Sequence, residues 1–196
     1  MKRKMPGTLR GRAAGFTLIE LMVTIAVAAI LLAVAAPSFV TFKRNSELTS
    51  ATNSLVGALS VARSEALKRG QNVMVIPATG NSWNNGVTVF VDLNNDQVLN
   101  TGEPVVFQQA ALPSYITAAG QSSGPSLAYI MFDASGYSRT SNATFQSATL
   151  TIARGDVSSA QQSDQTRIIV IAKTGRIRSC RPASSSDTTC AANSAE

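Results

Sequence analysis

The sequence of 196 residues lacks histidine altogether and contains only two cysteines. Without histidine, Ser-His and Cys-His nucleophilic pairs and every histidine-containing zinc site are excluded. The sequence also has no glycine-rich phosphate loop and no internal repeat. These absences leave little support for a membrane-anchored enzyme, so we expect a protein that is not an enzyme and has no cofactor. The length suits one ordinary domain with an appendage.

The basic charge of the chain is concentrated at its start. The formal net charge is +6, from 17 basic and 11 acidic residues. Five basic residues precede residue 16: Lys2, Arg3, Lys4, Arg10 and Arg12. The rest of the chain therefore has 12 basic residues against 11 acidic ones. The high isoelectric point thus belongs mainly to the N-terminal segment and is poor evidence that the whole chain binds nucleic acid.

Residues 16–36 form an apolar run with a single charge, Glu20. As a helix, this run would span ~30 Å, the thickness of the hydrocarbon core of a bilayer. The basic residues before it place its N-terminal side in the cytoplasm and direct the rest of the chain outward. A secretory signal peptide is the alternative, but its apolar region is shorter and ends in a small-residue cleavage site. The longer run favours a retained membrane helix.

The segment "GFTLIELMVTIAVAAIL" resembles the class III signal of type IV pilins and pseudopilins. This resemblance implies that a prepilin peptidase removes a leader, residues 1–15, by cutting after Gly15, and that Phe16 is then N-methylated. It also implies that Glu20 pairs with the terminal amine of a neighbouring pilin subunit, within an apolar bundle anchored in the inner membrane. The alternative is that Glu20 lies at the headgroup interface and is merely tolerated there.

The helical pattern continues beyond Pro37, where we expect a kink because proline removes one backbone hydrogen bond. Apolar residues recur at steps of three and four and form one stripe: Leu48, Ala51, Leu55, Ala58, Leu59, Ala62 and Ala66. Gly70, after the basic pair Lys68 and Arg69, is a natural helix stop. We therefore predict one helix over about 16–69, with an amphipathic second half, 37–69, that packs on a globular domain.

Beyond residue 70 the apolar period changes from helical to alternating, which indicates strands. The expected strands lie at 72–78, 86–93, 104–109, 127–133, 148–155 and 166–180, and the expected loops at 111–126 and 155–165. A long helix followed by strands predicts an α+β fold, in which the helix packs on an antiparallel sheet or sandwich, as in type IV pilins. The β-rich domain would span 70–196 and lie in the periplasm. We expect its tail after Cys190 to be disordered.

The globular part also resembles one narrower family, that of the FimT/GspH pilins and pseudopilins. Its stretch "ALSVARSEALKRGQNVMV" is similar to the text that joins the helix to the first strand in that family. "WNNGVTVFVDLNND" and the "GRIR" near the end resemble its first hairpin and its closing hairpin. The resemblance covers most of the chain but is patchy over 104–150.

Residues 92–103 have the ligand spacing of an EF-hand calcium loop, with oxygen-bearing side chains at positions 1, 3, 5, 9 and 12. These residues are Asp92, Asn94, Asp96, Asn100 and Glu103. Position 6, which should be glycine, is Gln97, and the flanking segments have the pattern of strands rather than helices. An Asx-rich hairpin turn is therefore the favoured interpretation, and calcium the weaker alternative.

Basic residues gather in the predicted C-terminal hairpin, with a turn at Thr174-Gly175. Arg176 and Arg178 are two residues apart, so we expect both side chains on one solvent-facing side of a strand, ~6.6 Å apart. Lys173 and Arg181 flank them. In FimT-like proteins a C-terminal Gly-Arg-x-Arg motif binds DNA, so this resemblance implies that DNA is a partner. The alternative is a solvated basic hairpin that discourages edge-to-edge aggregation.

The two cysteines, Cys180 and Cys190, follow this hairpin closely. Two such cysteines in a translocated chain predict one disulfide. Together these features predict a minor type IV pilin that assembles into or primes a pilus and contacts DNA. The rival hypothesis is a minor pseudopilin of type II secretion, which handles exported proteins and not DNA.

Overall fold

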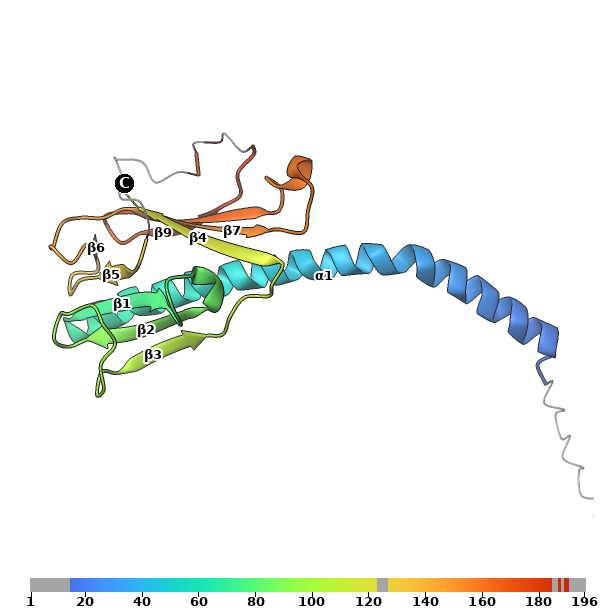
Figure 1. The fold of residues 1–196 in the computed structure, drawn as a ribbon, viewed down its shortest axis with the longest axis horizontal. Coiled ribbons are helices and arrows are strands. Elements are labelled where there is room, and N and C mark those ends of the chain that lie inside the picture. The colour runs from blue at the N-terminus through green and yellow to red at the C-terminus, as the bar shows by residue number, and fades with distance from the viewer. Residues whose placement is uncertain (1–14, 123–126, 185–186, 188, 191–196) are drawn as a thin grey trace, which may run out of the picture. The chain divides into compact units, whose positions relative to one another are not determined.

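The computed structural model describes residues 15–122, 127–184, 187 and 189–190 (Figure 1). The chain divides into two compact units, 1–43 and 44–196. The predicted leader, apart from Gly15, and the predicted disordered tail, 191–196, lie outside the described residues.

Helix α1, Leu18–Arg69, confirms the predicted long helix and continues through Pro37. It ends where expected, because Gly70 adopts a left-handed φ of 65° and its N–H binds the carbonyl of Ala66 at 2.9 Å. In the first unit, every side chain of the helix is exposed. In the second unit its apolar stripe is buried, as predicted, together with Thr52.

Two antiparallel sheets complete the second unit and appear as separate layers in Figure 1. The first sheet has the order β3-β2-β1-β5-β6, and its strands are β1 (Asn72–Pro77), β2 (Val87–Asp92), β3 (Val105–Gln109), β5 (Ile130–Phe132) and β6 (Ser138–Arg139). The second sheet has the order β4-β7-β8-β9, with β4 (Ile116–Ser122), β7 (Ala148–Arg154), β8 (Thr166–Ile171) and β9 (Ile177–Cys180). Two short 3₁₀ helices, η1 (Trp83–Asn85) and η2 (Ser159–Gln161), lie in the connections.

One apolar core joins the second half of α1 to both sheets. Leu55 and Leu59 of the helix contribute to the same cluster as Val75 of β1 and Ile169 of β8, and all four side chains are almost completely buried. Met74, Phe90 and Met131 form a smaller cluster separate from this core. Burial on this scale holds the helix and the two sheets together as one α+β domain.

Strand β4 corrects the prediction of a loop over 111–126. Its residues include alanine, glycine, glutamine and serine, which have low intrinsic strand propensity. Seven register pairs with β7, from Ile116–Arg154 to Ser122–Ala148, nevertheless make it a strand, because the partner supplies its hydrogen bonds. The strand predicted at 127–133 is shorter than expected and is limited to β5.

Candidate functional site

The N-terminal motif is exposed in the first unit, and Glu20 there caps its own helix. The Glu20 carboxylate accepts hydrogen bonds from the backbone N–H and the hydroxyl of Thr17, both at 3.4 Å. In return the Glu20 N–H donates to the Thr17 hydroxyl at 3.3 Å. This is a capping box, whose signal in the sequence is threonine followed three residues later by glutamate. This role of Thr17 was not predicted from the sequence.

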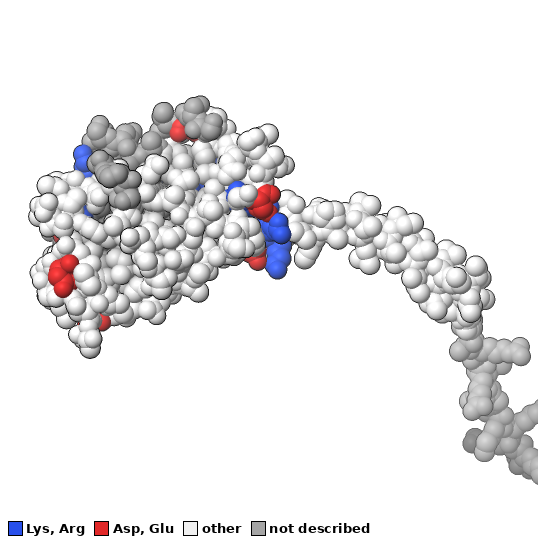
Figure 2. All heavy atoms as spheres, in the orientation of Figure 1, with Lys and Arg blue, Asp and Glu red and all other residues white. Residues whose placement is uncertain are grey.

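The first half of α1 presents apolar side chains on every side, with Leu18 76% exposed and Ile30 67% exposed. Within the described residues, α1 is the one helix long and apolar enough to cross a membrane, judged by length and composition. The face of this segment seen in Figure 2 carries no charged side chain. A surface of this kind requires lipid or other apolar helices around it.

The turn between β2 and β3 is the predicted Asx-rich hairpin turn. The buried carboxylate of Asp92 accepts hydrogen bonds from the backbone N–H groups of Asp96 (3.2 Å) and Gln97 (3.0 Å). The carboxylate of Glu103 accepts from those of Leu93 and Asn100, both at 2.8 Å. Gln97 takes a left-handed φ of 64° at the position where calcium loops use glycine. Among the described residues no group of three or more acidic, cysteine or histidine side chains could hold a metal ion.

Hydrogen bonds from the backbone also lower the pKa of the Asp96 carboxyl. The first cause is the N–H of Val98, which donates to Asp96 at 2.9 Å, and the second is the side-chain amide of Asn100. The anionic side chains of this turn thus bind the loop's own N–H groups. In an Asx turn such side-chain bonds take the place of the backbone hydrogen bonds of a sheet.

The predicted C-terminal hairpin is formed by β8 and β9, with its turn at Thr174-Gly175. The N–H of Gly175 binds the carbonyl of Ala172, and the N–H of Ala172 binds the carbonyl of Arg176, both at 2.9 Å. Gly175 has a φ of 76°, the left-handed conformation that favours glycine. Arg176, directly before β9, is exposed.

The other three predicted DNA-binding residues are partly buried or make contacts within the protein. Arg178 is half-buried, which corrects the expectation that it faces solvent, and its Nη1 donates to the carbonyl of Thr189 at 3.2 Å. Arg181 forms an ion pair with Asp164 at 2.5 Å. Lys173 is half-buried, and its carbonyl accepts a hydrogen bond from Ser138 at 3.0 Å. The hairpin therefore exposes Arg176 more fully than its basic neighbours Lys173 and Arg178.

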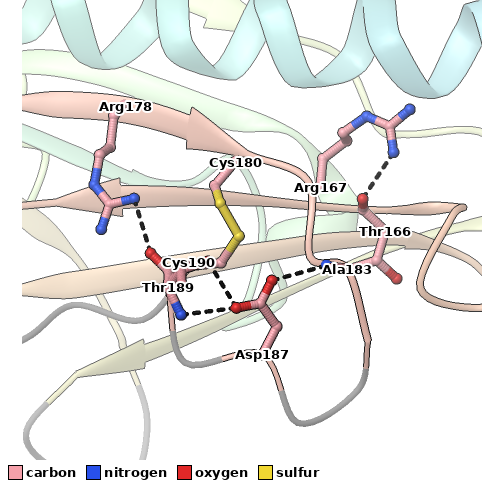
Figure 3. The surroundings of a disulfide bond; sticks show 8 residues. All are labelled: Thr166, Arg167, Arg178, Cys180, Ala183, Asp187, Thr189 and Cys190. Carbon is pink, nitrogen blue, oxygen red and sulfur yellow. Dashed lines mark hydrogen bonds between the residues drawn. A yellow bond between two sulfur atoms is a disulfide. The ribbon is translucent and has the colours of Figure 1, made fainter.

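The basic residues of this hairpin also lie on two different faces of the sheet. Arg178 pairs in register with Val170, and Figure 3 shows its side chain on the same side as the Cys180–Cys190 bridge. Arg167, one strand away, points toward helix α1 (Figure 3). The sequence could not assign these basic residues to separate faces, because strand parity across a hairpin depends on a register that composition does not reveal.

The disulfide between Cys180 and Cys190 confirms the predicted pairing, with Cα atoms 5.6 Å apart. It holds the segment after β9 against the sheet. Asp187 in that segment accepts hydrogen bonds from the N–H groups of Ala183 and Thr189, both at 2.8 Å. The bridge and these bonds place the carbonyl of Thr189 next to Arg178 (Figure 3).

A second charged cluster in this unit was not found from the sequence. The buried Arg154 donates from Nε and Nη2 to Asp156 at 2.9 and 2.8 Å, and from Nη1 to Asn45 of α1 at 2.6 Å. Arg44 adds an ion pair with Asp156 at 2.5 Å. The hydrogen bonds from Arg154, above all, lower the pKa of Asp156 to about 2. This cluster fastens α1 to the end of β7.

Comparison with known proteins gives two family matches. The family described as "Type II transport protein GspH" matches residues 51–175. The family described as "Prokaryotic N-terminal methylation motif" matches residues 10–36. No curated protein sequence matches the chain.

Solved structures with a similar fold include the type IV minor pilin FimU of Pseudomonas aeruginosa, with a TM-score of 0.52 and 23% identity. The similarity covers 70% of this chain and 90% of FimU, and it confirms the predicted α+β fold. The minor pseudopilin EpsH from the type 2 secretion system of Vibrio cholerae gives a TM-score of 0.49 and 16% identity, over 70% of this chain and 98% of EpsH.

Proposed function

Because this chain belongs to the GspH family of type II transport proteins and carries the N-terminal methylation motif, we propose that it is a minor type IV pilin that contacts DNA. A protein of this family is a structural subunit that assembles with other pilin-type subunits. The exposed apolar half of α1 supports this role, because helices of this kind are stable only in lipid or in a bundle of similar helices.

The N-terminal part of the proposal concerns processing and anchoring. A prepilin peptidase cleaves after Gly15 and releases the leader, residues 1–15, after which Phe16 is methylated. Residues 16–36 then anchor the protein in the inner membrane, 37–69 form the amphipathic half of the helix, and 70–196 form the periplasmic domain. Glu20 pairs with the terminal amine of a neighbouring subunit in the filament. In the free subunit the Glu20 carboxylate accepts a hydrogen bond from the N–H of Thr17. On assembly it exchanges this partner for the charged amine of the neighbouring subunit.

The DNA-binding part of the proposal rests on the β8–β9 hairpin, with the exposed Arg176 as its leading contact and Lys173, Arg178 and Arg181 around it. An arginine fork binds phosphate oxygens without reading the base sequence. Arg178 contributes mainly by holding the disulfide loop in place, because its Nη1 already binds the carbonyl of Thr189. The affinity should therefore be modest and independent of sequence.

The test is fluorescence anisotropy with the full-length protein in detergent and two unrelated DNA duplexes, at several salt concentrations. With three or four phosphate contacts, the logarithm of the affinity should fall with the logarithm of salt with a slope of roughly −3. Arg176→Gln with Arg178→Gln should reduce that slope by about one to two units and weaken both duplexes alike. Lys68→Gln with Arg69→Gln removes the same charge from the end of α1 and should leave the slope unchanged.

The second candidate function is that of a minor pseudopilin in type II secretion, which the description of the matching family favours. If the hairpin variant binds DNA as tightly as the wild type at every salt concentration, the hairpin is only a solvated sheet edge and this candidate is preferred. Loss of the gene would then impair export of folded proteins and leave DNA uptake intact.

A further inference from the structure

A pocket of about 220 Å³ lies between helix α1 and strand β9. Thr49, Thr52 and Asn53 line it from the helix, and Arg167, Ser179 and Arg181 line it from the sheet. Two guanidinium groups thus face hydroxyl and amide groups, and none of the residues that line the pocket is acidic. Such a lining suits an oxyanion, since it supplies charged donors and neutral polar groups together.

Arg167 is held in this pocket by one of its three side-chain nitrogens. Its Nη1 donates to the carbonyls of Asp164 at 2.9 Å and of Thr166 at 2.8 Å. Among the described residues, neither its Nε nor its Nη2 donates a hydrogen bond, since both of its side-chain bonds come from Nη1. Burial lowers the pKa of Arg167, and the nearby charge of Arg181 lowers it further. Two positive groups held this close repel each other, and a bound anion would relieve that repulsion.

The acid nearest to the pair is Asp164, which binds Arg181. Both side chains of that ion pair are more than half exposed, at 65% and 56%, so the pair is weak and an incoming anion can displace the carboxylate. On α1, Glu47 stands two residues from Thr49 and therefore does not share its face. Glu65 is bound to Lys68 and Arg69.

We propose that this pocket receives a phosphate group of the DNA whose backbone Arg176 also contacts. The inference rests on the proposed function and adds a second phosphate site on the helix side of the hairpin. Arg176 directly precedes β9 and Arg181 directly follows it. Five residue steps along the strand separate their Cα atoms by ~16 Å. That distance is longer than the separation of adjacent phosphates on one strand, so the pocket and Arg176 would take phosphates that are not adjacent.

The first test compares Arg167→Gln with Arg69→Gln, which removes the same charge elsewhere. Both variants are made in the full-length protein in detergent, and DNA affinity is measured by anisotropy across a salt series. Arg167→Gln should weaken binding about fivefold to tenfold at low salt and reduce the slope by about one unit. Arg69→Gln should stay within about twofold of the wild type. A loss for Arg167→Gln no larger than that of Arg69→Gln overturns the inference.

Arg167 also binds two backbone carbonyls, so its loss could weaken the fold, and a second variant of opposite sign removes that ambiguity. Asp164→Asn frees Arg181 from its carboxylate partner. It should tighten DNA binding about threefold, a gain that misfolding cannot produce. Glu65→Gln changes the charge equally at the other end of α1 and should have no such effect. Unchanged or weaker binding by Asp164→Asn overturns the inference.

Inorganic phosphate serves as the direct probe, followed through the side-chain ¹⁵Nε–Hε resonances of the arginines in the full-length protein. Addition of phosphate should shift the resonances of Arg167 and Arg181 and leave that of Arg69 in place. If phosphate shifts Arg167 but Arg167→Gln binds DNA like its control, the pocket takes free phosphate only and the inference fails. The proposed function still stands in that case if Arg176→Gln weakens DNA binding. If the wild type binds no DNA, both fail.

Discussion

Gly175 of the β8–β9 turn lies so close to Gly136 of the β5–β6 turn that a Cβ on Gly175 would come within 1.9 Å of the Gly136 carbonyl oxygen. The two turns belong to different sheets. Arg63 of α1 joins them, because its Nε donates to the carbonyl of Gly136 and its Nη2 to that of Thr174, both at 3.1 Å. The glycine before Arg176 therefore has a structural role that does not depend on DNA.

Replacing Gly175 with alanine should destabilise the domain by at least about 2 kcal/mol, because the side chain adds a clash to an unfavourable φ. Urea unfolding of the full-length protein in detergent, followed by the fluorescence of the single tryptophan, Trp83, measures this change. Trp83 is a suitable probe because it is buried in the core.

Gly80→Ala is the matched control for this substitution. Gly80 has a φ of 61°, but nothing lies within 4 Å of where its Cβ would be. It should lose only about 1 kcal/mol, the cost of the left-handed backbone. Equal losses in the two variants would show that contact with Gly136 contributes nothing.

Local patterns predicted those parts of this fold that depend on neighbours in the sequence. The bounds of α1 followed from its apolar periodicity and from Gly70, and the last hairpin followed from alternation around Thr174-Gly175. Strand β4 was missed because its own residues are weak strand formers, and pairing with β7 made it a strand. Propensity is local, whereas pairing depends on a partner about thirty residues later in the sequence.

The same distinction explains what the sequence could and could not predict of the candidate site. The residues of the β8–β9 hairpin were identified correctly, but not which face each of them occupies. Arg178 is held by Thr189 and Arg181 by Asp164, and both contacts depend on the path of the chain beyond the hairpin. Arg167 lay within the predicted strand but acquired its place beside Arg181 only through the register of β8 and β9.

The ion pairs of Asp156 predict a dependence of stability on pH. Its pKa is about 2 in the folded protein, against an ordinary value of 3.8, chiefly because Arg154 donates hydrogen bonds to it. A lowered folded-state pKa contributes stability above the ordinary value, and that contribution is lost as the pH falls from about 4 to about 2. Asp156→Asn should therefore cost about 1 kcal/mol at pH 7, after allowance for screening, and almost nothing at pH 2.

Urea unfolding at a series of pH values measures this difference. Asp164→Asn is the control, because its pair with Arg181 is more exposed, and it should change stability by less than about 0.5 kcal/mol at pH 7. A difference between wild type and Asp156→Asn that stays constant down to pH 2 would exclude the ionised carboxylate as its source.

The disulfide should stabilise the segment that Arg178 contacts. Closing a loop between residues ten apart, Cys180 and Cys190, is worth about 2–3 kcal/mol in the chain-entropy model. Cys180→Ser with Cys190→Ser should lower the unfolding free energy by about that amount. Thiol labelling without reductant is the accompanying measurement, and two reactive thiols in the native wild type would contradict the bridge.

Two substitutions at Glu20 separate its two roles. Glutamine preserves the capping box, since its amide oxygen still accepts from the N–H of Thr17, whereas alanine removes it. Both variants should be cleaved after Gly15, because the proposed peptidase recognises the glycine. Both Glu20→Gln and Glu20→Ala should nevertheless fail to enter filaments, because neither offers a negative charge to the neighbour's amine within the apolar bundle.

Intact-mass analysis of the membrane-extracted protein shows whether the leader is lost and a methyl group gained, and immunoblotting of sheared filaments shows incorporation. Thr17→Val is the complementary variant: it removes the hydroxyl from the cap and leaves the Glu20 charge, so filaments should still form. Incorporation of Glu20→Gln at the wild-type level would mean that Glu20 acts only through its contact with Thr17. The charge pairing between subunits would then have to be abandoned, because an uncharged amide cannot replace it.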